Sequence, residues 1–260
     1  MSIEQPSYIP DAVQRFDYYL DAIEPELVDG IEIADFREPR MHQVRRVGEQ
    51  FKFTTFPESS EIADSYLKIF RAKEGDVIID AGAYCGLTAY LFSKAVGSAG
   101  KVVAIEADPR NYECLTSNLN RLQVQNIDVL QAAVWRSNGL VDFASEGNMG
   151  SAILEVSPGK PNKVGVRALT LSDICDELSL SRVDHVKVDI EGAEYEALPA
   201  ASGFIARYRP DFLVEMHLEN DRPVNVPRLQ KFFAKLDYEM RFVPQPGDEI
   251  FPLLYFWPKR

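Results

Sequence analysis

Acidic and imidazole side chains stand where several apolar segments of this sequence end. The six are Asp80, Glu106, Asp189, Glu191, Glu215 and His217. Ligands in open α/β sheets bind beyond the carboxyl ends of the strands, where the strand order reverses. Acids gathered there repel one another unless a positive group lies among them. A sulfonium, a substrate amine or a divalent metal would supply that charge. The alternative is that some of these side chains point away or cap helices.

The sequence Val-Ile-Ile-Asp-Ala-Gly-Ala-Tyr-Cys-Gly at residues 77–86 predicts a buried strand that ends on an acid and turns through glycines. With the following helix and the strand Val102–Glu106, it forms the unit with which α/β sheets hold adenosine-containing cofactors. A dinucleotide fingerprint would need its second glycine at Tyr84, whose side chain we expect to fill the pyrophosphate volume. The dinucleotide interpretation is therefore disfavoured.

The pattern Asp-x-Gly-x-x-x-Gly suits S-adenosylmethionine (SAM), which has a ribose, a sulfonium and an amino-acid tail but no pyrophosphate. Asp80 beside the tight turn suits the cationic end of this cofactor, and Glu106 suits the ribose hydroxyls. An ordinary strand–helix turn with capping or solvent-facing acids is the alternative.

The segment Asp189-Ile190-Glu191-Gly192 is the next strongest signal. Asp189 and Glu191 are two residues apart, so in an extended chain they project to the same side. They could act as a base toward a substrate hydroxyl or as oxygen ligands for a hard cation, or Glu191 could cap the next helix. His217 could accept a proton, orient a hydroxyl or be a satisfied polar residue at a strand end. We predict Asp189, Glu191 and His217 as catalytic residues and assign no metal.

Composition narrows the class of protein. The chain has 260 residues, 46% of them apolar, with 28 basic and 40 acidic residues and a formal charge of −12. This charge argues against nucleic acid and anionic membrane surfaces as partners. The three cysteines lie far apart, which favours a reducing compartment. With no membrane-length apolar run and no secretory signal, we expect a soluble cytoplasmic protein. The sequence leaves a homo-oligomer open.

Helices and strands are predicted to alternate, which implies a mostly parallel sheet covered on both faces. We expect residues 1–72 to form a helical cap or extension, either structural or a substrate-facing lid, and 73–260 to form the main domain. Residues 31–57 could be strands or loops. The predicted helices include Asp11–Ile23, Glu61–Phe70, Gly86–Val96, Leu171–Leu178, Ala193–Tyr208 and Val226–Leu236. The predicted strands include Ile127–Trp135, Leu140–Phe143, Ala152–Val156, Val164–Leu169, Val183–Ile190, Phe212–His217, Tyr238–Val243 and Phe251–Phe256.

These motifs together resemble the FkbM-type SAM-dependent methyltransferases over roughly residues 75–245. The resemblance is carried by Asp-Ala-Gly-Ala-Tyr-Cys-Gly at 80–86, Val-Ala-Ile-Glu-Ala-Asp-Pro at 103–109, Gln-Ala-Ala-Val at 131–134 and Val-Lys-Val-Asp-Ile-Glu-Gly-Ala-Glu at 186–194. The last is the most specific. The family often has asparagine where Tyr84 stands, which leaves the turn contacts open.

The resemblance implies a Rossmann-like class I fold with a mostly parallel seven-stranded sheet. It also implies methyl transfer from SAM to a hydroxyl of a small molecule, usually a sugar or a polyketide-like metabolite. By position, Asp80, Gly82 and Gly86 would hold the methionine part, Glu106 the ribose, and Ala133 would lie near the adenine. Asp189 and Glu191 would face the reacting end. The full predicted cofactor set is Asp80, Gly82, Ala83, Tyr84, Gly86, Glu106, Ala107 and Ala133.

Two other classes stay open at this point. One is a nicotinamide-dependent oxidoreductase on a similar sheet, against which the missing second glycine argues. The other is a methyltransferase-like module that binds SAM or a partner chain without catalysis, against which the intact acids at the strand ends argue.

Overall fold

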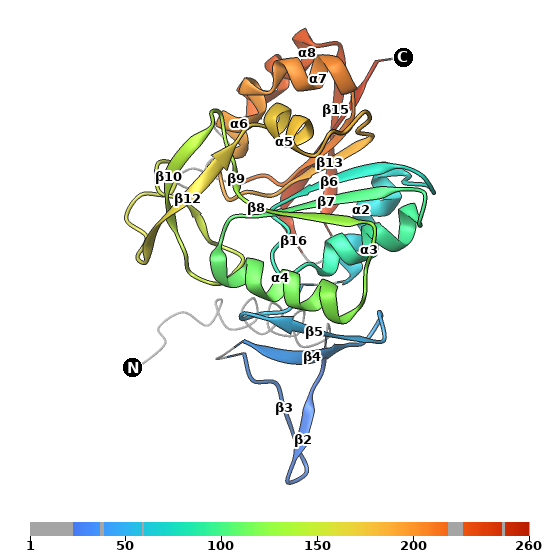
Figure 1. Ribbon diagram of the computed structural model, residues 1–260, viewed down its shortest axis with the longest axis vertical. Coiled ribbons are helices and arrows are strands. Elements are labelled where there is room, and N and C mark those ends of the chain that lie inside the picture. The colour runs from blue at the N-terminus through green and yellow to red at the C-terminus, as the bar shows by residue number, and fades with distance from the viewer. Residues whose placement is uncertain (1–22, 37–38, 59, 218–225, 246–247, 260) are drawn as a thin grey trace.

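A seven-stranded sheet forms the centre of the molecule (Figure 1). The computed structural model describes residues 23–36, 39–58, 60–217, 226–245 and 248–259. The strand order is β15-β16-β14-β13-β6-β7-β8. All neighbours from β14 to β8 pair in parallel, and β16 is antiparallel to both of its neighbours. The predicted mostly parallel sheet is confirmed. Its strands are β6 Val77–Ala81, β7 Lys101–Glu106, β8 Ile127–Gln131, β13 His185–Val188, β14 Asp211–Val214, β15 Tyr238–Gln245 and β16 Asp248–Pro258.

Helices cover both faces of this sheet, as predicted (Figure 1). Successive strand residues point to opposite faces, so Ile78 packs in one core and its neighbour Ile79 in the other. Burial on both faces explains why these strands read as nearly continuous apolar runs. One face carries α2 Ser60–Phe70, α3 Leu87–Val96 and α4 Pro109–Arg121, and the other carries α5 Leu171–Glu177, α6 Glu194–Ala200, α7 Ser202–Tyr208 and α8 Val226–Lys235.

A second, four-stranded sheet has the order β11-β10-β12-β9. The prediction of one continuous strand over Ile127–Trp135 is wrong, because the chain leaves the main sheet between β8 and β9. The pairing of β8 with β7 ends where Gln131 lies opposite Glu106, and β9 pairs with β12 instead. Its strands are β9 Ala133–Val134, β10 Gly139–Ala144, β11 Ala152–Ile153 and β12 Lys163–Leu169.

The predicted single helix over Ala193–Tyr208 is also wrong. Two helices, α6 and α7, occupy this stretch and meet at Ala201, whose backbone leaves helical geometry at φ −88° and ψ 21°. Pro199 has no N–H to donate, so the first helix loses a hydrogen bond in its last turn. The predicted end before Pro210 is correct, because Arg209 closes α7 in the left-handed region.

The described part of the predicted cap consists mainly of strands. The predicted helix Asp11–Ile23 lies outside the described residues except for Ile23, which begins β1. Phe51 and Phe53 of β5 belong to the same hydrophobic core as α3, so this segment is joined to the sheet by packing. The domain boundary at residue 72 stays a prediction. The strands are β1 Ile23–Glu24, β2 Glu26–Val28, β3 Ile31–Ile33, β4 Arg40–Val44 and β5 Glu49–Phe53.

No helix among the described residues is both long and apolar enough to cross a bilayer.

Gly82 is the position at which the turn tolerates no side chain. Its φ is 82°, and a Cβ there would lie 1.8 Å from the carbonyl oxygen of Asp189. We expect Gly82→Ala to lower the free energy of unfolding by at least about 2 kcal/mol, because left-handed strain and a backbone clash add. Gly75→Ala is the control, since Gly75 has φ 86° and open space around its Cβ position. Denaturant unfolding of both variants measures the difference, and equal losses would contradict the close approach.

Candidate active site

A cleft of about 650 Å³, a volume that includes space open to solvent, lies at the carboxyl ends of β6, β7 and β13. Five of the predicted cofactor residues line it, and so do two of the three predicted catalytic residues. These are Gly82, Tyr84, Glu106, Ala107 and Ala133, with Asp189 and Glu191. Asp80 and Ala83 are fully buried, and Gly86 caps α3. His217 lies beside Asp189 and Glu191. The structure therefore gathers both predicted sets at one edge of the sheet.

The glycine turn is held by its own backbone and by Glu106. The N–H groups of Gly82 and Ala83 both donate to the carbonyl of Ile105 at 3.0 Å, and the N–H of Tyr84 donates to Glu106 Oε2 at 2.8 Å. Glu106 Oε1 accepts the N–H of Asp108 at 2.8 Å. Burial raises the pKa of Glu106 to about 8. Each oxygen keeps accepting capacity, as a carboxylate that binds ribose hydroxyls requires.

The side chain of Tyr84 corrects one argument from the sequence. Its hydroxyl donates to the carbonyl of Phe56 at 3.0 Å and lies 3.0 Å from Thr54 Oγ1. Its ring is buried and stacks on Phe53. This tyrosine therefore holds residues 54–56 against the turn. The sequence analysis expected its side chain to fill the volume of a diphosphate, and it does not. Steric exclusion by Tyr84 is no longer an argument against a dinucleotide.

The opposite end of the cavity is mostly apolar. Its walls come from the ends of β7 and β9 and from the second sheet, which suits a flat heterocycle better than a charged group. The sequence analysis named no site residue in the stretch from β10 to β11, because a loop between short strands gives no periodic signal. The apolar lining residues are Ile105, Ala132, Ala133, Val134, Phe143, Met149 and Ile153, and the missed polar ones include Asn111, Asn148 and Ser151.

Lys187 is the buried cation of the site. Its ammonium donates to the carbonyl of Gly82 at 2.7 Å and lies 3.3 Å from both Asp80 Oδ1 and Asp189 Oδ2. Burial alone would lower the pKa of Lys187, but the carboxylates of Asp189, Asp80, Glu58 and Glu215 outweigh it and raise the pKa. The side chain stays charged and neutralises part of the acidic cluster. The sequence signal was a lysine within an apolar strand.

The Glu-Gly-x-Glu motif forms a tight turn that positions His217. Glu191 and Gly192 both have positive φ, 54° and 94°. The turn brings the buried side chain of Glu194 back toward Ile190 and His217. Its Oε1 accepts the N–H of Ile190 at 3.0 Å and lies 2.8 Å from His217 Nδ1. His217 Nε2 then faces Asp189 and Glu191, at 3.6 Å from a carboxylate oxygen of each.

The carboxylates around His217 favour its protonated form. Burial of the ring would lower its pKa, but Glu194 and Glu191 hold the pKa well above its ordinary value of 6.5. The imidazolium can donate hydrogen bonds, while a role as base requires a pH above its raised pKa.

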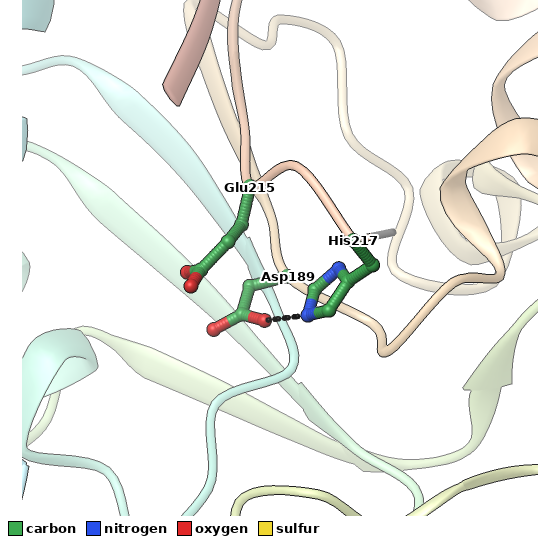
Figure 2. Close-up of side chains that lie close together, drawn as sticks. All are labelled: Asp189, Glu215 and His217. Carbon is green, nitrogen blue, oxygen red and sulfur yellow. Dashed lines mark ion pairs between the residues drawn. The ribbon is translucent and has the colours of Figure 1, made fainter. Parts of the chain in front are cut away.

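Asp189, Glu215 and His217 converge from the ends of β13 and β14 (Figure 2). Each offers one potential ligand atom, and these atoms lie within 4.8 Å of one another. However, Lys187 and His217 already lie against the two carboxylate oxygens of Asp189. A metal would have to displace or deprotonate these cations, which weighs against a divalent ion at this position.

A family profile decides the class of protein. The profile of the methyltransferase FkbM domain matches residues 80–240, which is more than half of the chain. The chain belongs to the FkbM methyltransferase family. The predicted family is thereby confirmed, and a search of curated proteins gave no match.

A solved structure with a TM-score above 0.5 shares the fold of this chain. Methyltransferase FkbM from Methylobacillus flagellatus KT has a TM-score of 0.54 and 19% identity, over 70% of this chain and 44% of that chain. Fibrillarin from Aeropyrum pernix, solved with bound SAM, has a TM-score of 0.49 and 17% identity, over 89% and 86% of the two chains. This chain thus spans under half of the Methylobacillus protein. The predicted Rossmann-like class I fold is confirmed.

Four groups of the site make the stability of the protein depend on pH. Burial raises the pKa of Glu58 to about 7 and those of Glu106 and Glu215 to about 8, and carboxylates raise that of His217. Each group holds its proton more tightly when folded. Stability from these groups is therefore lost as the pH rises from about 5 to about 8.

We expect the melting temperature to fall across this range, and Glu215→Gln, which cannot ionise, to flatten the fall. Thermal unfolding at constant ionic strength measures both slopes. A melting temperature that rises with pH in this window would contradict the assignment.

Because cations already flank Asp189, we expect no divalent metal to bind strongly at the trio of Figure 2. Calorimetric titration of the chelator-treated protein with Mg²⁺ and Mn²⁺ should show no binding, and EDTA should leave turnover unchanged. Saturable binding that Asp189→Asn abolishes would show instead that the trio is a metal site.

Proposed function

We propose that this FkbM methyltransferase transfers the methyl group of SAM to a hydroxyl oxygen of a small molecule, in a sugar or a polyketide-like metabolite. One observation carries the proposal: a single cavity joins the Gly82 turn, Glu106 and an apolar wall to the carboxylates of Asp189 and Glu191. A nucleoside with a cationic tail needs surfaces of these kinds.

The residues of the cavity fit SAM. Gly82 leaves no room for a side chain beside Asp189, Glu106 offers acceptors for ribose hydroxyls, and the apolar wall suits adenine. When bound, SAM supplies a methyl group that its sulfonium already activates. The protein then mainly has to hold the acceptor oxygen in line, and such positioning can contribute roughly 7–11 kcal/mol.

Asp189 is our proposed acceptor of the hydroxyl proton. It lines the cavity, and His217 lies 3.6 Å away as a protonated partner. A hydroxyl has a high pKa, so a placed base adds about 10²–10⁴-fold to the rate. The imidazolium of His217 orients the carboxylate and can donate to the acceptor oxygen. Glu191 faces the same cavity and contacts the same ring.

The acceptor should be neutral or cationic rather than anionic. Asp189 and Glu191 both line the cavity. The chain as a whole has a formal charge of −12. A phosphate-bearing acceptor such as RNA would meet like charge there. We therefore propose a small hydroxylated acceptor and a cytoplasmic enzyme, with no nucleic-acid or membrane partner.

The cofactor proposal is tested by calorimetric titration with SAM, its demethylated product S-adenosylhomocysteine, and NAD. We expect the first two to bind and NAD not to bind. Binding of NAD without binding of SAM or S-adenosylhomocysteine would contradict the proposal. Methyl transfer is then followed from labelled SAM over a panel of neutral sugars and hydroxylated polyketides. Tight SAM binding without transfer to any acceptor would favour a non-catalytic module.

Two variants test the proton acceptor. We expect Asp189→Asn to lower turnover by about 10²-fold or more, the usual contribution of a placed base. His217→Ala should also lower turnover, because it removes the partner of that carboxylate. SAM affinity, measured by calorimetry, should stay near that of the wild type in the His217 variant. Wild-type turnover in both variants would remove these residues from the mechanism.

A further inference from the structure

Glu58 extends the cofactor site beyond the segment that matches the family. It lies upstream of residues 80–240, in the segment between β5 and α2. It lines the cavity together with Gly82, Tyr84 and Asp189. The contacts of Tyr84 with Thr54 and Phe56 hold this segment across the glycine turn. Glu58 is thus brought to the cavity by tertiary packing.

The carboxylate of Glu58 is fixed by α3. Its Oε2 accepts a hydrogen bond from the N–H of Leu87 at 3.0 Å, and its Oε1 accepts one from the hydroxyl of Thr88 at 2.9 Å. The local N-cap is Gly86, which has no side chain to do this. Each oxygen of Glu58 accepts one bond, and a carboxylate has about four acceptor positions, so capacity remains toward the cavity.

The electrostatic surroundings of Glu58 would stabilise a cation beside it. Lys187 is the ammonium that faces Glu58, Asp80, Asp189 and Glu215. Asp80 is fully buried, and its ion-pair partner is Lys187, 3.3 Å from Oδ1. Lys187 is already engaged by Asp80, Asp189 and the carbonyl of Gly82, and no basic side chain among the described residues forms an ion pair with Glu58. A second ammonium there would be stabilised by Coulomb attraction in a poorly solvated site.

We propose that Glu58 binds the α-ammonium group of the methionine part of SAM. This inference rests on the proposed use of SAM. An ammonium offers three donors and one positive charge, which the fixed carboxylate of Glu58 can accept, with Asp80 behind it as a supporting charge. Residues before position 72 then take part in cofactor recognition as well as packing.

The test compares ligands with and without the amino-acid tail. S-adenosylhomocysteine carries the ammonium, and 5′-methylthioadenosine keeps the nucleoside and a thioether but lacks it. We expect Glu58→Gln to weaken the binding of S-adenosylhomocysteine about tenfold or more, because a hydrogen bond to a charged group is lost. Affinity for 5′-methylthioadenosine should not change. Calorimetry gives both dissociation constants without any need for turnover.

The control is Glu61→Gln, which removes an exposed negative charge three positions along the chain and should leave both affinities unchanged. Glutamine at position 58 can still accept from Leu87, so the cap on α3 is largely kept. Equal weakening of both ligands in Glu58→Gln would show that Glu58 only shapes the turn, and unchanged affinity for both would remove it from the site. Failure of the wild type to bind S-adenosylhomocysteine would overturn the SAM proposal itself.

Discussion

The buried ammonium of Lys187 is the interaction on which the site depends. Lys187 lies opposite Asp80 in the register of β13 and β6, and it also contacts Asp189 and the carbonyl of Gly82. A fully buried carboxylate such as Asp80 is costly without a partner. The lysine therefore makes it feasible for two neighbouring strands to end on acids, and it fixes the carbonyl side of the turn that follows β6.

The cavity has two chemically different halves. Carboxyl groups at the ends of β6 and β13 and in the segment before α2 surround the ammonium of Lys187 on one side. The wall built by the second sheet is apolar and includes Phe143 and Ile153. A ligand that is cationic at one end and aromatic at the other is held by both halves at once. The departure of β9 from the main sheet after Gln131 creates the second half.

The sequence was most informative where local patterns and the sheet geometry act together. Apolar runs that end on Asp80, Glu106 and Asp189 predicted the parallel strands, and the carboxyl ends of such strands necessarily meet at one edge. Local patterns failed where the outcome depends on distant residues. The hydroxyl of Tyr84 is held by Thr54 and Phe56, and nothing in the turn itself encodes these contacts.

Two further failures have the same origin. The break at Ala201 follows from a single proline in an otherwise helical pattern, which allows either a kink or an end. The raised pKa of His217 follows from Glu194, an acid at the start of a helix that the left-handed turn at Glu191 brings to the ring. Both depend on backbone conformations that residue type permits but does not dictate.

Shared hydrogen bonds join the glycine turn to strand β5. Asn118 of α4 pairs with both backbone groups of Lys52 in β5, at 2.7 and 2.8 Å, and also donates to the carbonyl of Cys85 in the turn. Thr54 joins Tyr84 to Asn111, which lines the cavity. Because the same side chains satisfy β5 and the turn, displacing β5 would leave buried polar groups of the turn without partners, at a cost of about 1–3 kcal/mol each. A ligand that orders the turn therefore also stabilises the packing of β5, so the proposed boundary at residue 72 separates two sequence segments but does not separate two independent energetic units.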